Sequence, residues 1–175
     1  YQGSANVTTL GTIATGTWNG TAITAAYIAD NKGTKHFGDT IKILPTDFMS
    51  NEEGGLNKSH QFVDNGTVGV RATSNAAELY AFVAIPEGKT ATAVTIYGND
   101  TSNVVHVYEL DINANTGLTA SDGSGSNITH ASGCVVGTSC DITDTASTAT
   151  NYLAIEVEIT DHANDIVYGG IVTIS

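Results

Sequence analysis

The chain of 175 residues has few cationic side chains, and all of them lie in its first 89 residues. Residues 90–175 contain ten acidic side chains and no lysine or arginine, and the net charge of the whole chain is −12. Nucleic-acid binding depends on cations that displace counterions from phosphates, so we expect no DNA or RNA partner for this half. The acidic surface fits the solubility of an extracellular particle. A surface for basic or cation-bridged partners is the alternative.

Long apolar runs are also absent. A membrane-spanning helix needs about 20 apolar residues, whereas the runs in this chain are only a few residues long. We therefore expect no insertion into a membrane, and the sequence shows no signal peptide. Because the chain begins with Tyr1 and not with methionine, we expect further residues upstream. Two prolines, 14 % charged residues and 41 % apolar residues indicate a folded chain, with room for one core of about 100–150 residues and an extension.

Large apolar side chains recur every five residues near the start of the chain, at Ile13, Trp18, Ile23 and Ile28. Threonine and glycine fill most positions between them. This spacing matches neither the 3.6-residue period of a helix nor the 2-residue period of a strand. The pattern indicates that copies of the segment from several chains share one apolar axis. We therefore predict a stalk and neck at residues 1–39 that forms a homotrimer, with a short neck helix at residues 21–30.

The segment GTIATGTWNGTAI within this stretch resembles the Gly/Thr-rich stalk segments of tail fibres and other appendage proteins of tailed bacteriophages, marine ones in particular. In that family the segment lies in a trimeric stalk or collar ahead of a globular head. Residues 81–100 and 151–175 are similar in style to the β-structured heads of such fibres. The resemblance implies a location on the virion surface. A generic Gly/Thr-rich linker to a β-domain is the alternative interpretation.

Residues 40–175 are predicted to form an all-β head. Strand-like segments, with no helical periodicity among them, occur at 40–44, 61–71, 78–85, 90–97, 103–110, 134–136, 140–142, 152–159 and 166–174. About eight strands at this spacing favour an antiparallel β-sandwich of jelly-roll type. We expect the core to contain Tyr80, Phe82, Val94, Ile96, Val105, Val107, Leu153, Ile155, Val157, Ile171 and Ile174.

Cys134 and Cys140 are the only cysteines and enclose five residues that include Gly137. A tight turn at this glycine would bring the two sulfurs within bonding range, so the pair is a disulfide candidate. Two free thiols are the alternative. Metal or redox chemistry fits poorly, because the chain offers no second cysteine pair and no C-x-x-C motif.

No catalytic constellation is apparent, and we expect neither an enzyme nor a cofactor. Ser124 and Ser126 lie in a Gly/Ser-rich loop that cannot hold a nucleophile in place. Glu156 and Glu158 share one strand face, which we expect to be solvated and therefore unsuited to acid–base chemistry. Glycan hydrolysis is the alternative enzymatic interpretation.

One loop offers oxygen ligands at alternate positions, as calcium loops do, at Asp111, Asn113, Asn115 and Asp122. It departs from the EF-hand pattern because Thr116 occupies the place of the glycine. A polar loop without metal explains the same residues, so this remains a weak calcium candidate.

The sequence thus favours a trimeric virion appendage whose head binds a host-surface glycan or outer-membrane protein and whose stalk contacts other virion proteins. We expect recognition in the loops at 99–103, 113–127 and 161–165, with Tyr108 and Tyr168 as stacking surfaces. A capsid-attached head fibre or decoration protein, and a bacterial surface adhesin or filament subunit, are the alternatives.

The stalk hypothesis makes a direct prediction. Replacing Trp18 and Ile23 with serine removes two apolar layers, each worth about 1.5–3 kcal/mol per buried side chain, so the variant should be monomeric. Analytical ultracentrifugation at micromolar concentration measures this. A wild-type chain that sediments as a monomer would contradict the hypothesis.

Overall fold

The structure, a computed structural model, describes residues 38–51, 59–74, 77–113, 126–127 and 134–175. These residues belong to one compact unit, Phe37–Ser175. The predicted oligomerisation residues and the neck helix lie outside the described residues and stay predictions.

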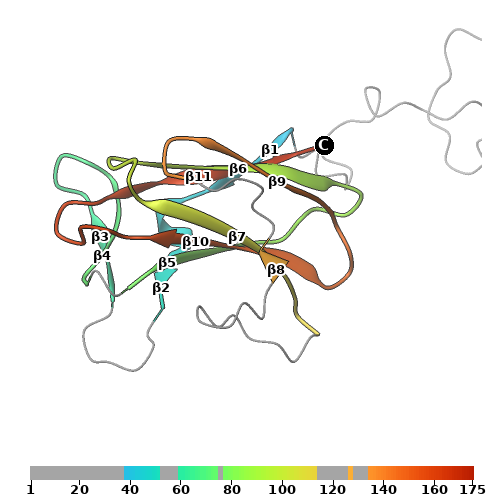
Figure 1. Cartoon of the computed structure of the whole chain (residues 1–175), viewed down its shortest axis with the longest axis horizontal. Helices are drawn as coiled ribbons and strands as arrows, with labels where there is room; N and C mark the ends of the chain where they lie inside the picture. Colours follow the sequence, from blue (N-terminus) through green and yellow to red (C-terminus); the bar gives the residue numbers. More distant parts are fainter. Residues whose placement is uncertain (1–37, 52–58, 75–76, 114–125, 128–133) are drawn as a thin grey trace, which may run out of the picture. The chain divides into compact units, whose positions relative to one another are not determined.

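Two antiparallel sheets pack face to face (Figure 1). One has the strand order β3-β4-β11-β6-β9, with β1 also paired to β11, and the other has the order β2-β5-β10-β7-β8. The strands are β1 Thr40–Ile43, β2 Phe48–Ser50, β3 His60–Val63, β4 Gly69–Ala72, β5 Leu79–Val83, β6 Thr90–Gly98, β7 Val104–Asp111, β8 Ser126–Asn127, β9 Ser139–Ala146, β10 Asn151–Glu158 and β11 Val167–Ile174, with a 3-10 turn η2 at Pro45–Asp47.

The connectivity is that of a jelly roll. Its first sheet contains β1-β11-β6-β9 and its second contains β5-β10-β7-β8, so that successive strands alternate between the sheets except at β7 and β8. Strands β2, β3 and β4 are inserted between the first two jelly-roll strands and extend both sheets. The all-β sandwich predicted from strand spacing is therefore confirmed for the described part of the chain.

Strands β1 and β4 both pair with β11, and the pairing of β11 with β6 shifts register between Val167 and Gly169. Gly169 has φ +131°, and a Cβ at this position would lie 2.6 Å from the carbonyl oxygen of Ile43. Only glycine combines this backbone conformation with so close an approach.

The core lies between the sheets and follows the two-residue alternation of the strands. Eight of the predicted core residues are buried there: Val94, Ile96, Val105, Val107, Leu153, Ile155, Val157 and Ile174. They come from β6, β7, β10 and β11, so both sheets contribute.

Three predictions about the core need correction. Phe82 is 47 % exposed, Ile171 is only half-buried, and Tyr80 is buried but points away from the core. Strand β5 is apolar on both faces, and Leu79, Ala81 and Val83 take the inward positions. A continuous apolar run does not reveal which of its two faces meets the other sheet, which is why Phe82 was misassigned.

The segment 61–71, whose glycines allow either two short strands or one bulged strand, forms two strands, β3 and β4, around a turn at Gly66, which has φ +82°. Other strand boundaries differ from the sequence prediction. The segment 134–136 contributes only an isolated bridge between Val135 and Val104. Strands β2 and β8 have too few residues to give a sequence pattern.

The sandwich has two distinct ends. Both ends of the described chain lie at one of them, where Ile174 N donates to Asp39 O at 2.9 Å and Thr90 and Ser175 exchange backbone hydrogen bonds. The loops at 99–103 and 161–165 lie at the opposite end, because Asn99 N donates to Ile166 O at 3.1 Å. The loop at 113–127 starts at the chain-terminus end, where Ile112 N donates to Thr150 O. The start of this loop, at Asn113, therefore lies at the other end from the loops at 99–103 and 161–165.

The exposure of Phe82 predicts that two substitutions by alanine lower the free energy of unfolding by different amounts. Phe82→Ala should destabilise the head by about 1 kcal/mol because nearly half of the ring already contacts water. Leu153→Ala should cost about 2–5 kcal/mol because that side chain is fully enclosed. Urea unfolding of both variants measures the difference, and equal costs would contradict the assignment of faces.

Candidate functional site: the outward face of one sheet

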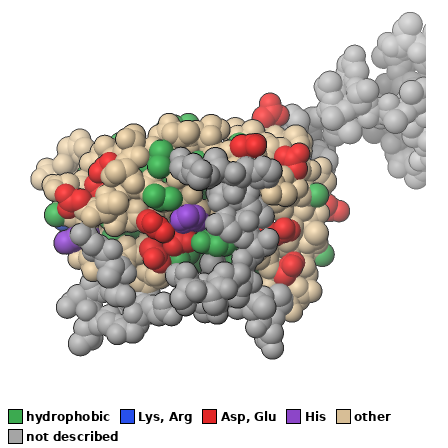
Figure 2. All heavy atoms as spheres, viewed as in Figure 1, with side chains coloured by type: hydrophobic (Ala, Val, Ile, Leu, Met, Phe, Trp, Pro, Cys, Tyr) green, Lys and Arg blue, Asp and Glu red, His purple; other side chains and the backbone are tan. Residues whose placement is uncertain are grey.

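The outward side of the sheet formed by β5, β10 and β7 carries aromatic and acidic side chains together (Figure 2). The register pairs Glu156 with Tyr80 on one side and with His106 on the other, and Ala154 with Phe82 and Tyr108. We call this surface the aromatic–acidic face and define it by Tyr80, Phe82, His106, Tyr108, Tyr152, Glu156 and Glu158.

Aromatic rings form a row across this face. The Tyr80 and Phe82 rings stack with centroids 6.4 Å apart, and the Phe82 ring meets that of Tyr152 at 6.1 Å. The separations fall in the range of favourable ring pairs, so each ring limits the motion of the next. On β7, the His106 and Tyr108 rings lie 6.3 Å apart.

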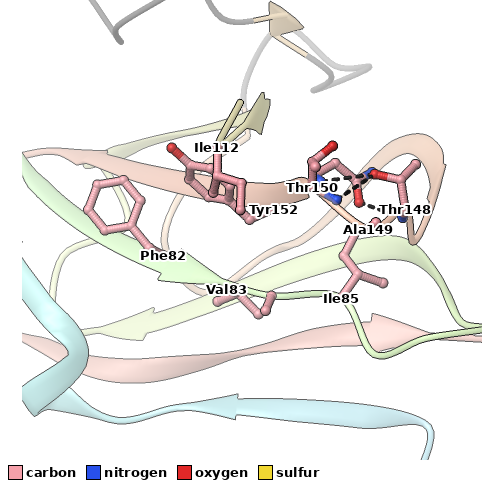
Figure 3. Close-up of a pocket in the computed structure, with 10 residues that line it drawn as sticks. Phe82, Val83, Ile85, Ile112, Thr148, Ala149, Thr150 and Tyr152 are labelled. Carbon is pink, nitrogen blue, oxygen red and sulfur yellow. Dashed lines mark hydrogen bonds between the residues drawn. The ribbon is translucent and has the colours of Figure 1, made fainter. Parts of the chain in front are cut away.

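The row of rings ends in an open pocket of about 500 Å³ at the chain-terminus end of the sandwich (Figure 3). Phe82, Tyr152 and Ile112 line one part of it, and the turn at 148–150 lines another. Ile112 is 74 % exposed and is one of the most exposed large apolar side chains among the described residues.

Side-chain hydrogen bonds hold the 148–150 turn in place. Thr148 Oγ1 accepts from the backbone N–H of Asn151 at 2.9 Å, and Asn151 Oδ1 accepts from the N–H of Thr148 at 2.7 Å. Thr150 Oγ1 donates to the Asp111 carboxylate at 2.8 Å. This wall of the pocket is therefore fixed before any ligand arrives.

Glu156 is the unusual residue of the face. Its side chain is only 3 % exposed, and its Oε2 atom is buried without a hydrogen-bond partner. Burial raises the pKa of Glu156, and the neighbouring Glu78 carboxylate acts in the same direction. The hydroxyls of Tyr108 and Tyr80 and the imidazole of His106 oppose the rise in this pKa.

The two tyrosines beside Glu156 remain hydrogen-bond donors at ordinary pH. Desolvation and the nearby carboxylates raise the pKa of Tyr80 and the pKa of Tyr108 well above their usual range. The Tyr80 hydroxyl donates to Glu78 Oε2 at 3.1 Å. Next to them His106 Nε2 lies 3.2 Å from the Glu158 carboxylate, which is half exposed.

The expectation that Glu156 and Glu158 share a solvated strand face is wrong for Glu156. The two residues do point to the same side, but Glu156 lies between Tyr80 and His106 on neighbouring strands. The Tyr108 hydroxyl also interacts with its carboxylate. Tyr108 and Tyr168 do not form a joint stacking surface either, because β7 and β11 belong to different sheets.

The polar loops at the opposite end bond mainly to each other. Asn103 Oδ1 accepts from the N–H of Thr160, and Asp165 Oδ2 accepts from the N–H of Asp161 at 2.8 Å. Asn99 binds the backbone of both Asn164 and Ile166. Asn103 and Asp165 are buried, so these predicted recognition groups are engaged in holding the loops.

The cysteine pair lies beside these loops. Cys134 and Cys140 have Cα atoms 5.5 Å apart and are placed as a bonded pair. Gly137 has φ +84°, and Thr138 N donates to Val135 O at 3.1 Å, which closes the turn between the cysteines.

The calcium candidate lies only partly within the described residues. Asp111 and Asn113 are exposed, whereas Asn115 and Asp122 lie outside the description. No group of three or more metal-ligating His, Cys, Asp or Glu side chains occurs within the ranges described above. Those ranges also contain no helix long and apolar enough to cross a membrane.

Comparison with protein-family models, with curated proteins and with solved structures finds no match for this chain.

The burial of Glu156 predicts a pH-dependent effect of Glu156→Gln. Because the folded-state pKa of Glu156 is raised above its ordinary value of 4.5, the wild-type residue favours folding below pH 4.5 and opposes it once the folded carboxyl ionises. The substitution should therefore stabilise the head by about 1–2 kcal/mol at pH 7.5, and the gain should shrink toward pH 4.5. Urea unfolding across this pH range measures it.

Glu158→Gln is the matched control on the same strand, and it should change stability by less than about 0.5 kcal/mol because Glu158 is half exposed. If the Glu156→Gln variant is less stable than wild type at every pH, the ionised Glu156 carboxylate does not oppose folding, and this prediction is wrong.

Proposed function

We propose that this chain is a virion appendage protein of a tailed bacteriophage and that the described residues form a head that attaches the particle to a host-surface receptor. The proposal joins two observations: the stalk-like segment around Trp18 and the jelly-roll sandwich that follows it. Jelly rolls are common in capsid and lectin domains, where a rigid sandwich presents a binding surface.

The observation that carries the proposal is the pocket lined by the exposed Phe82 and Ile112 side chains. Monomeric proteins rarely leave several large apolar side chains together in water unless the surface binds something. Phe82 and Ile112 are both substantially exposed, and the ring of Tyr152 lies against Phe82. The fixed turn beside them gives the surface a shape that exists without a ligand.

The positions of the two ends of the described chain also fit an appendage protein. Both ends of the described chain leave the sandwich at one end, so any further segments attach there. The aromatic–acidic face runs along the side of the head and reaches the chain-terminus end at the pocket.

Two experiments test the proposal. Antibodies raised against the full chain should label the tail of particles that carry it in immunogold electron microscopy. Purified chain added to host cells should also reduce adsorption of those particles, because it occupies the same receptors.

Labelling across the capsid with unchanged adsorption would instead support a capsid decoration protein. If the antibodies label bacterial cells but no phage particles, the result would support a surface adhesin. Either result overturns the proposed attachment role.

A further inference from the structure

We propose that the aromatic–acidic face and its pocket bind a glycan that presents hydroxyl or amino groups and carries no acidic groups. The inference rests on the proposed attachment role and names the chemistry of the receptor. Apolar sugar faces would lie against Phe82, Tyr152 and Ile112, and hydrogen-bond donors would reach the carboxylate of Glu156.

The apolar part of the ligand is argued from the exposed rings. Phe82 lies within the regular pairing of β5 and β10, directly opposite Ala154. Because the alanine side chain is small, the Phe82 ring extends further from the sheet than its neighbour does. A flat ring in this position offers a platform to the C–H face of a sugar. Tyr152 and Ile112 continue the platform into the pocket.

The polar part is argued from the unpartnered carboxylate oxygen. An ionised oxygen buried without a donor is costly, and native proteins rarely retain one without a role. Glu156 lies two residues along the sheet from Ala154 and Phe82, or about 7 Å. A short oligosaccharide seated on Phe82 therefore extends over Glu156. Because Glu156 is buried, a ligand reaches it only when the half-buried Tyr108 side chain, whose hydroxyl interacts with the carboxylate, turns aside.

The charge on this sheet selects against acidic sugars. Strands β2, β5, β10, β7 and β8 contain no lysine or arginine, and Glu156 and Glu158 project from the same face, with Glu78 at its edge. A sialic or uronic acid would place its carboxylate against these groups, and the described strands of this sheet offer no lysine or arginine to pair it. The same repulsion opposes a second copy of the head packed face to face through this surface.

A printed array of neutral, amino-bearing and acidic oligosaccharides tests the inference on the full chain. The bound set should contain neutral or amino-bearing glycans only. The best of these, measured by isothermal titration, should bind the double variant Phe82→Ala/Tyr152→Ala at least about tenfold more weakly, because the stacking platform is gone.

Tyr97→Ala is the matched control, because Tyr97 is exposed to nearly the same degree as Phe82, at 46 %, but lies on the other sheet. Its affinity should equal that of wild type. Glu156→Gln should bind about tenfold more weakly although its fold is more stable, so that lost binding cannot be ascribed to unfolding.

Preferential binding of acidic glycans, or equal losses in the Tyr97 and Phe82/Tyr152 variants, would overturn the inference. A chain that binds no glycan but still blocks adsorption would also overturn it and would leave the attachment role standing with a protein receptor. A chain that binds neutral glycans through Phe82 without affecting adsorption would support the site and contradict the attachment role.

Discussion

The burial of strand β10 on both of its faces is the constraint on which the rest of the head depends. It lies between β5 and β7 in the middle of its sheet, and its inward residues Leu153, Ile155 and Val157 are fully enclosed. Those residues fix the register against the opposite sheet, since a shift by one position would exchange the two faces. The same register determines which side chains point outward, and it places Glu156 between Tyr80 and His106.

This arrangement of the outward face lowers the free energy of unfolding of the head. A carboxylate with a buried, unpartnered oxygen opposes folding at neutral pH, and exposed rings such as Phe82 contribute little to the core. Stability alone would favour an uncharged side chain at position 156 and a polar one at position 82. Sites that bind ligands commonly sacrifice stability in this way, which is why we assign recognition to the face and not to the loops around Asn103 and Asp165.

The sandwich was predictable because strand alternation and turn residues are local signals. The alternation in 103–110 identifies Val105 and Val107 as inward residues, and the structure places both in the core. The outward site was not predictable in the same way. The face of Phe82 is hidden within a run that is apolar on both sides, and the burial of Glu156 depends on Tyr80 and Tyr108, which lie about 50 to 75 residues away in the sequence. Only the strand pairing brings these residues together.

The central claim is that Glu156 is a buried carboxylate on an outward sheet face and that its Oε2 atom has no hydrogen-bond partner. The most direct measurement is an NMR titration of its side-chain carboxyl carbon in the intact chain, assigned by comparison with Glu156→Gln. The account predicts a midpoint above the ordinary value of 4.5. A midpoint for Glu156 at or below 4.5 would contradict it.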